Sequence, residues 1–240
     1  MRIDRVALDI DSIPRDEVLR YLGYKGQGLS AGLDARVEDM MARCLGVAKP
    51  VAALRSHKVL RIDEGEEGCV ARPEVVLEGT ALRLTGHDVT RHLRGAREVV
   101  LMAVTLGVGV DVELRRLALV DAVGQVAFDA AASAAVECAV DAAEALARRY
   151  AAESGAYCGR RFSPGYGDLP LEVQPVFLQS LDASRRLGIT LTSGNLMVPT
   201  KSVTAFVGIY DGPQAGVAAS CDMCSLADAC ALRARGITCA

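Results

Sequence analysis

Arg161 and the five residues after it form the segment of this sequence best suited to bind a small polar molecule. The segment reads RFSPGY and ends at Tyr166. Its Pro-Gly pair predicts a tight turn, and a glycine in a turn lets backbone amides and carbonyls come close to a ligand. The planar guanidinium of Arg161 can hold a carboxylate or a phosphate through paired hydrogen bonds. The segment therefore predicts either a ligand-binding turn or an ordinary surface turn.

Two acidic residues form a second candidate. Glu137 and Asp141 lie four residues apart in a long alanine-rich stretch that is predicted to be helical, so both carboxylates lie on one face. Like charges at this spacing destabilise a helix by about 0.2–0.5 kcal/mol, and neither residue has a basic residue three or four positions away. Glu144 and Arg148, one turn further on, form a favourable pair. Either the acids form a solvated face, or a carboxylate is kept free for a cationic ligand.

Four of the eight cysteines lie in the last 20 residues, at Cys221, Cys224, Cys230 and Cys239. Four thiols so close together can surround one tetrahedral centre, either an iron–sulfur cluster or zinc. Only the first pair has the common Cys-x-x-Cys spacing, so free thiols or a reversible disulfide stay an alternative. We expect residues 1–219 to form the folded domain and residues 220–240 a cysteine-rich tail.

Other catalytic patterns are weak in this sequence. Gly107 and Gly109 follow a predicted strand, but Val112 stands where a dinucleotide-binding loop needs its third glycine, so a plain turn between strand and helix is expected. The three histidines lack the spacing of a metal or catalytic set, and no serine lies in a nucleophile elbow. Hydrolase and dehydrogenase functions are therefore disfavoured.

The charge balance bears on partners and location. The 240 residues include 27 basic and 30 acidic side chains, for a net charge of −3, and no basic stripe appears. This composition argues against a nucleic-acid partner. The longest uncharged stretch, residues 187–200, is too short and too polar to span a bilayer. Charges in the first five residues stand where a secretory signal needs an apolar core. We expect a cytoplasmic protein with no membrane partner.

Predicted strands and helices occur both in succession and in alternation, so the sequence predicts an α+β fold. Asp121 is the expected N-cap of the long alanine-rich helix, and residues 154–170 are expected to be a loop. The predicted helices are Arg15–Leu22, Leu33–Leu45, Asp88–Leu93, the helical stretch Val108–Ala152, and Leu171–Leu187; the predicted strands are Val51–Ile62, Glu74–Glu78, Ala81–Leu84, Glu98–Leu106 and Ser202–Tyr210.

Several of these pieces together resemble the activation domain of cobalamin-dependent methionine synthase. They are the RFSPGY turn, the helix Leu171–Leu187, and the segments LGITLT at 187–192 and MVPTKSV at 197–203. The resemblance runs in register from about Ala122 to Ile209. With no cobalamin or folate module in the sequence, the chain is similar to the free-standing form of that domain. The resemblance implies an antiparallel or mixed sheet flanked by helices, one of them long and central.

The resemblance also implies a site for S-adenosylmethionine. In the family, the arginine that matches Arg161 holds the methionine carboxylate, and backbone at Phe162, Gly165 and Tyr166 contacts the adenosine end. An acidic residue on the long helix, which the register places at Glu137, also engages the cofactor.

An aspartate near the start of the domain belongs to the family's site as well. Either Asp9 or Asp11 matches it, and the sequence alone does not separate them. The family has a further tyrosine beyond the Ser202-Val203 strand, which has no clear counterpart here.

The implied function is reductive reactivation of cobalamin-dependent methionine synthase or a related corrinoid methyltransferase. The chain would bind S-adenosylmethionine, dock on the partner's cobalamin-binding domain and present the methyl group to cobalt, while an electron donor reduces the metal. Cobalamin would be present only in the partner. The chain would be an activation component with no catalytic residue, rather than a complete enzyme.

Two other functions stay open. Because reactivation consumes an electron, an iron–sulfur cluster is favoured over zinc for the tail. The chain could then be an iron–sulfur redox protein that delivers electrons to a corrinoid protein. It could also be a scaffold that keeps the fold and only binds its partner.

Overall fold

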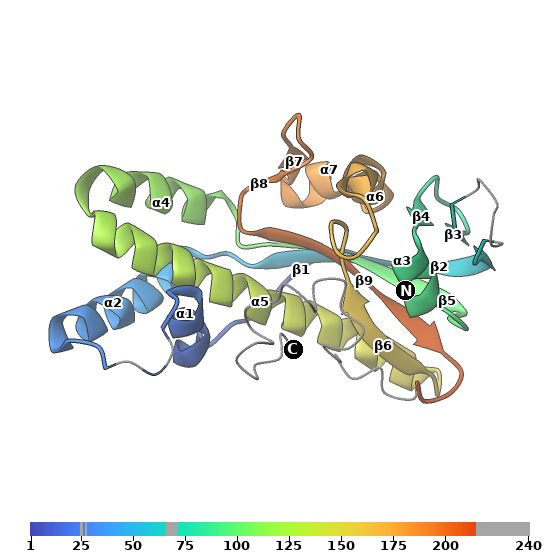
Figure 1. Cartoon of the computed structure of the whole chain (residues 1–240), viewed down its shortest axis with the longest axis horizontal. Helices are drawn as coiled ribbons and strands as arrows, with labels where there is room; N and C mark the ends of the chain where they lie inside the picture. The colour runs from blue at the N-terminus through green and yellow to red at the C-terminus, as the bar shows by residue number, and fades with distance from the viewer. Residues whose placement is uncertain (25, 27, 66–71, 215–240) are drawn as a thin grey trace.

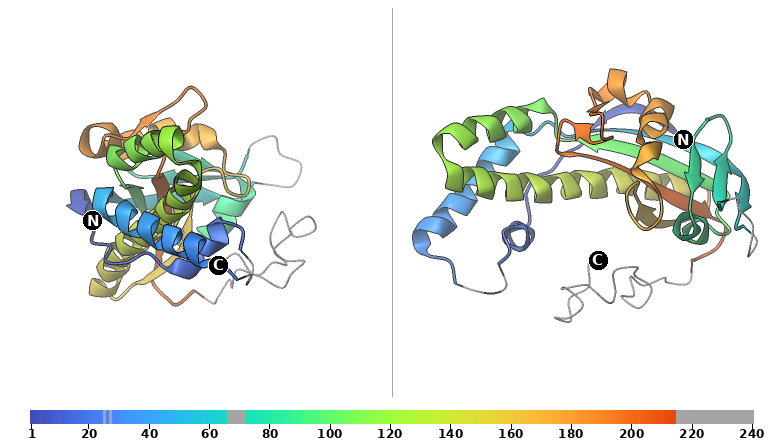
Figure 2. Two further views of the ribbon diagram at one scale, coloured as in Figure 1. Left: turned by 90° about the vertical axis from the view of Figure 1, so that its left-hand side faces the viewer. Right: turned by 45° about the horizontal axis from the view of Figure 1, so that its top comes forward.

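A computed structural model describes residues 1–24, 26, 28–65 and 72–214. Within these residues the chain forms a seven-stranded antiparallel sheet between two layers of helices, together with one small hairpin (Figures 1 and 2). The strands are β1 Arg2–Ala7, β2 Val51–Asp63, β3 Glu74–Leu77, β4 Arg83–Thr85, β5 Glu98–Thr105, β6 Tyr157–Phe162, β7 Thr190–Leu191, β8 Met197–Val198 and β9 Ser202–Tyr210. The helices are α1 Arg15–Tyr21, α2 Ala31–Val47, α3 His87–His92, α4 Val108–Val120, α5 Ala122–Glu153, the 3-10 turn η1 Leu171–Val173, α6 Gln174–Ser180 and α7 Ala183–Leu187. The predicted α+β class and long central helix are confirmed.

The sheet has the order β4-β3-β2-β5-β9-β6. β1 pairs with the first half of β2, on the side opposite β5. Every pairing among the described strands is antiparallel. The central strands β5 and β9 are almost wholly buried, since helices cover both faces of the sheet. β6 is the last strand, so it places its residues at an edge of the sheet.

Two hydrophobic cores lie on the two faces of the sheet. Alternate residues of β5 enter different cores, with Met102 in one and Leu101 in the other, as the pleat of a strand requires. The first core, which we call the α5 core, is closed by α1, α2, α4 and α5. The second, the α6 core, is closed by α3, α6 and α7.

The long helix α5 is the main support of the α5 core. Asp121 caps it, because its carboxylate accepts a hydrogen bond from the Gly124 amide (2.9 Å), as predicted. Ten of its buried residues are alanines, so sheet and helix come close together. Among the described helices α5 alone is long and apolar enough to cross a membrane, but 61% of its most apolar window is buried inside the fold.

The structure corrects two of the predicted elements. Residues 154–170 are not all loop, because β6 lies within them and pairs with β9. The helix predicted over Leu171–Leu187 is broken into η1, α6 and α7, and the break falls at Asp182, which has a left-handed backbone (φ 53°). The turn predicted at Gly107 is confirmed, since it joins β5 to α4.

Candidate functional site

Arg161 lies opposite a row of charged residues on α5, and this group forms the candidate site. Its guanidinium contacts the carboxylates of Asp141 (2.5 Å), Glu144 (3.1 Å) and Glu137 (3.4 Å). Arg148, one turn further along α5, pairs with Glu144. We call these five residues the acid–arginine cluster. Three carboxylates face two guanidinium groups, so the cluster carries one net negative charge.

A β-bulge in β6 directs Arg161 towards α5. Cys158 pairs with Ile209 and Arg161 with Val207, so three steps along β6 match two along β9. Without a bulge, residues three apart in a strand point to opposite faces. With the bulge, Arg161 pairs with Val207, whose side chain belongs to the α5 core. Paired residues point to the same face of a sheet, so the Arg161 side chain reaches α5.

Two glycines leave space beside this bulge for the ring of one buried tyrosine. The ring of Tyr210 fills the space beside Gly159 and Gly208, where an added Cβ would lie 2.8 Å from ring atoms. The Tyr210 hydroxyl donates to the carbonyl of His92 (2.8 Å), and burial raises the pKa of Tyr210 to about 12. The tyrosine thus stays neutral and fastens the end of β9 to α3.

Burial and charge act in opposite directions within the acid–arginine cluster. Burial disfavours the charged Arg161 side chain, but the hydrogen bond and charge of Asp141, with Glu144 and Glu137, outweigh it and raise the arginine's pKa. Burial also raises the pKa of Glu137, although Arg161 opposes that shift. The Asp141 side chain is 70% exposed and that of Glu144 only 12%. Asp141 is therefore the carboxylate that a ligand can replace most easily.

Glu137 and Asp141 have a basic partner that their spacing within the helix does not reveal. Within α5 they have none, but β6 supplies Arg161 from outside the helix. Glu144 also contacts Arg161, in addition to its predicted pairing with Arg148. The sequence signal for this contact was the spacing of acids along one face of α5.

The turn after β6 is held by its own hydrogen bonds. The Gly165 amide donates to the carbonyl of Leu169 (2.9 Å) and the Tyr166 amide to that of Ser163 (3.2 Å). Gly165 has a left-handed backbone (φ 88°), which favours glycine. The expected amide donors at these two positions are therefore used within the turn. The Tyr166 carbonyl also accepts from the Leu169 amide (3.2 Å), which leaves the exposed Tyr166 side chain to meet a ligand.

Asp168 fixes the turn to α3. Its carboxylate accepts hydrogen bonds from the backbone amides of His87 (2.6 Å) and Asp88 (3.0 Å). Amides at the start of a helix have no partner within the helix, so a carboxylate there stabilises both segments. The turn after Arg161 is thereby set in place relative to the sheet.

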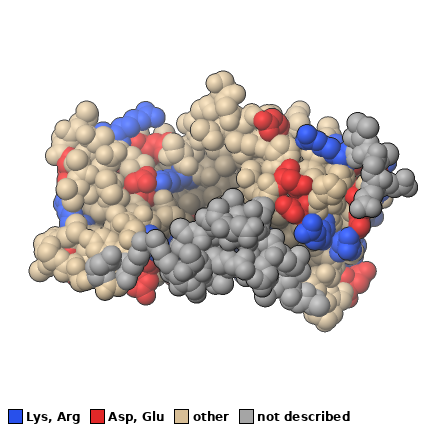
Figure 3. All heavy atoms as spheres, viewed as in Figure 1, with Lys and Arg blue, Asp and Glu red and all other residues tan. Residues whose placement is uncertain are grey.

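Part of the β9 edge is open beside this turn. β9 pairs with β5 from Ser202 onward, whereas β6 pairs with β9 only from Phe206 to Tyr210. Over residues 202–205, no described strand pairs with the β6 side of β9. Figure 3 shows a hollow in this region, near the middle of the molecule. Unpaired backbone groups in a hollow can hydrogen-bond to a small polar ligand.

The remaining predicted site residues lie around this edge. The Phe162 ring points away from α5 and packs against His92 (5.1 Å between ring centroids) and Phe206 (5.7 Å). Tyr166 is 70% exposed on the turn. Asp9 and Asp11 are exposed between β1 and α1, and neither forms a hydrogen bond or ion pair with the described residues. The structure thus brings Glu137 and Arg161 into contact, and places Phe162, Gly165 and Tyr166 next along the chain.

The described residues contain no group of three or more histidine, cysteine or acidic side chains that could hold a metal ion. The four cysteines proposed as metal ligands, Cys221, Cys224, Cys230 and Cys239, lie outside the described residues. The metal prediction and the boundary at residue 219 therefore stay predictions.

Comparison with known proteins identifies the fold. No family model and no curated protein matches the sequence. Among solved structures, the chain is similar to the MetH reactivation domain bound to AdoHcy, with 18% sequence identity and a TM-score of 0.57. The match covers 98% of this chain and 86% of that one. The chain therefore has the fold of a methionine synthase reactivation domain, as the sequence motifs predicted.

Proposed function

We propose that this chain is an accessory protein that binds S-adenosylmethionine and supports reductive reactivation of a cobalamin-dependent methionine synthase or related corrinoid methyltransferase. The observation that carries the proposal is the position of Arg161, which β6 presents to the carboxylates of α5 beside the open edge of β9. The similar solved domain is bound to AdoHcy, the product left when S-adenosylmethionine gives up its methyl group.

The charges of the acid–arginine cluster fit this ligand. S-Adenosylmethionine carries a carboxylate, an ammonium and a sulfonium group, and so has one net positive charge. The cluster has one net negative charge from Glu137, Asp141 and Glu144 against Arg148 and Arg161. The ligand's carboxylate would replace Asp141 on Arg161, and the freed Asp141 and the half-exposed Glu137 would then face its cationic groups.

The chain's own residues bind and orient the ligand in this scheme. Arg161 would hold the carboxylate end, and the turn at Gly165, fixed by Asp168, would border the adenosine end. When bound, S-adenosylmethionine supplies a methyl group that cobalt can accept. No general base is required, so positioning is the protein's main contribution.

Titration calorimetry with S-adenosylmethionine tests the binding site. We expect the full chain to bind the ligand and Arg161→Ala to bind it more weakly by about 1.5–3 kcal/mol, the scale of a hydrogen bond to a charged group. Arg185→Ala is the matched control, because Arg185 is an exposed arginine of α7 that pairs with an acidic residue, Asp182.

Equal affinities for the wild-type chain and a folded Arg161→Ala variant would refute this site. Equal losses in the Arg161 and Arg185 variants would instead indicate a non-specific effect of removing a positive charge. Far-ultraviolet circular dichroism of each variant establishes that the fold is intact.

A further inference from the structure

The helical hairpin formed by α4 and α5 exposes an unusual amount of apolar surface. Six of the twelve exposed large hydrophobic residues in the described chain lie within its 19 residues from 108 to 126, and each of the six is more than half exposed. They are Val108, Val112, Leu119, Val120, Val123 and Val126. Val126 faces α1, whereas the residues of α4 lie on a different side of the hairpin. Apolar side chains that lie together on the surface of a folded protein mark an interaction site.

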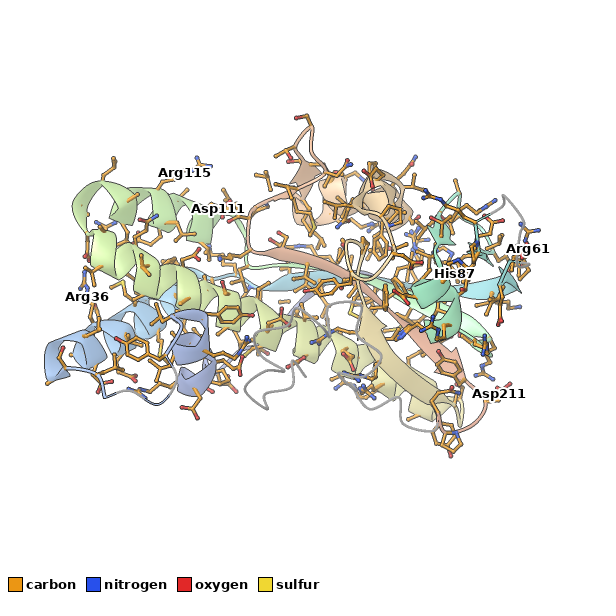
Figure 4. The ribbon with its side chains drawn as sticks, in the orientation of Figure 1. Arg36, Arg61, His87, Asp111, Arg115 and Asp211 are labelled. Atoms are coloured by element: carbon orange, nitrogen blue, oxygen red, sulfur yellow. The ribbon has the colours of Figure 1, made fainter. Side chains whose placement is uncertain are left out.

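The outer face of α4 has the spacing of a helix-pairing surface. Val108, Val112, Arg115 and Leu119 follow one another at intervals of four, three and four residues, the repeat by which two helices pack side by side. The opposite face of α4 is already buried in the molecule, for example at Leu117. Figure 4 shows that Arg115 points away from α5. We call these four outer residues the α4 stripe.

The charges around the hairpin are mostly neutralised within the chain. Arg43 and Arg116 share Glu113, and Arg36 contacts Asp121 and Asp39, so three basic residues meet three acidic ones. Arg115 forms no hydrogen bond or ion pair with any other described residue. Arg115 is thus the one charge of the stripe without a partner among the described residues, and the other charges nearby cancel. The intervals of four, three and four residues are the same in both directions, so a second copy in antiparallel orientation matches the stripe.

We propose that the α4 stripe pairs antiparallel with the same stripe of a second copy, so that the protein is a two-fold symmetric dimer. In antiparallel pairing, Val108 lies across from Leu119 of the second copy and Val112 across from its Arg115. The aliphatic part of Arg115 then covers Val112, and its guanidinium reaches solvent at the rim. In this pairing the two Arg115 side chains do not lie directly across from each other.

This dimer leaves the acid–arginine cluster accessible. Glu137 lies eleven residues beyond Val126 on α5, which is roughly 16 Å along the helix. The inference rests on the exposed hairpin alone and does not depend on the proposed function.

Sedimentation equilibrium of the full chain, with reductant present to prevent disulfides between copies, tests the proposal. We expect the mass of a dimer. Leu119→Asp should weaken dimerisation at least tenfold, because it places a charge opposite Val108. Arg115→Leu should strengthen it, because the stripe becomes wholly apolar. Leu60→Asp is the control, since Leu60 is 60% exposed on β2 and lies outside the hairpin.

The mass of a single chain at every concentration would overturn the proposal. So would a dimer that Leu119→Asp leaves unchanged, or one that Arg115→Leu weakens while circular dichroism shows that variant folded. The Arg115 variant keeps the test decisive even if the charged substitution at Leu119 perturbs α4.

Discussion

Arg161 is bound by three carboxylates that differ in exposure, and this difference controls which of them a ligand can displace. The contact with exposed Asp141 contributes little stability, as is usual for ion pairs in water. Glu144 is nearly buried and also holds Arg148, so its contact with Arg161 is harder to break. Arg161 can therefore exchange Asp141 for a ligand carboxylate while Glu144 keeps the guanidinium in position.

Glu137→Gln tests whether a carboxylate of the cluster meets a cationic ligand. The substitution keeps the shape of the side chain and removes its charge. We expect affinity for S-adenosylmethionine to fall by about 0.2–1 kcal/mol, the range for a partly exposed charge pair. Affinity for AdoHcy, which lacks the sulfonium charge, should fall less. Titration of both ligands measures the difference, and Glu172→Gln, at an exposed glutamate of η1, serves as the control.

The difference in the free energy of unfolding between Glu137→Gln and the wild-type chain should depend on pH. Burial raises the pKa of Glu137 above its unfolded value, so the folded state favours the protonated form. The stability from this group is present at low pH and is lost as pH rises through the folded pKa. Glu137→Gln should therefore gain stability relative to wild type as pH rises above the ordinary glutamate pKa, about 4.3. A stability gain with no loss of affinity would mean that Glu137 belongs to a solvated acidic face.

At the residue scale, the sequence could single out Glu137 and Arg161 but could not predict that they touch. The acids stand out because their helix offers no basic partner at the right spacing. Arg161 reaches them only because a bulge in β6 shifts the register by one residue, so that its side chain points to the face covered by α5. Bulges depend on contacts between strands distant in sequence, and here on the ring of Tyr210, so no local pattern predicts them.

At the scale of elements, the bulge predicts opposite effects for two glycine-to-alanine substitutions. In Gly208→Ala the added Cβ would lie 2.6 Å from the Tyr210 hydroxyl and 2.8 Å from its ring. We expect this overpacking to destabilise the fold by about 1–3 kcal/mol and to weaken ligand binding by moving β6. Gly46→Ala, in the last turn of α2 with no atom within 4 Å of the new Cβ, should stabilise by about 0.4–1 kcal/mol, because alanine has fewer conformations in the unfolded chain.

Denaturant unfolding of both glycine variants measures these changes. A Gly208→Ala protein as stable as wild type would show that Tyr210 does not hold the bulge closely. If Gly208→Ala unfolds more easily but binds S-adenosylmethionine normally, then β6 does not position the site.

The elements that the sequence predicted well are those with strong local signals. β5 and β9 are continuous apolar runs, and α5 has an N-cap and a long alanine-rich body. β6 was missed because its six residues, YCGRRF, include a glycine and two arginines, which are unusual in a strand. It forms because β9 is already placed by the core. The break at Asp182 was missed although the two arginines that contact it, Arg185 and Arg186, lie only three and four residues further along the chain.

At the scale of the whole molecule, the cysteine-rich tail carries a separate prediction. If Cys221, Cys224, Cys230 and Cys239 hold one metal centre, the double variant Cys221→Ser/Cys224→Ser should lose the metal. Protein purified without oxygen is assayed for iron, sulfide and zinc. An iron–sulfur centre would show broad visible absorption that bleaches on reduction, whereas zinc would be colourless and removable by a chelator.

Two other cysteines serve as a matched control for the tail. Burial raises the pKa of Cys44 to about 12 and that of Cys158 to about 11, so both thiols stay protonated at neutral pH. Because the thiolate is the metal ligand, Cys158→Ser should leave the metal content unchanged. S-Adenosylmethionine binding should survive loss of the tail centre, because Arg161 and Glu137 lie on β6 and α5. Less than about 0.2 metal per chain in anaerobic protein would rule out a structural centre.

The central claim is that this chain allows methyl transfer from S-adenosylmethionine to cobalt in a partner protein. The most direct test mixes the chain with the cob(II) form of a methionine synthase that lacks its own reactivation domain, a one-electron reductant and S-adenosylmethionine. One electron reduces cobalt, and the methyl group then moves from sulfur to cobalt, leaving AdoHcy. We predict equal amounts of methylcobalamin and AdoHcy only when the chain is present, and a slower rate with Arg161→Ala at low ligand concentration. Cobalt that stays in the cob(II) form although calorimetry shows S-adenosylmethionine bound to the chain would contradict the claim.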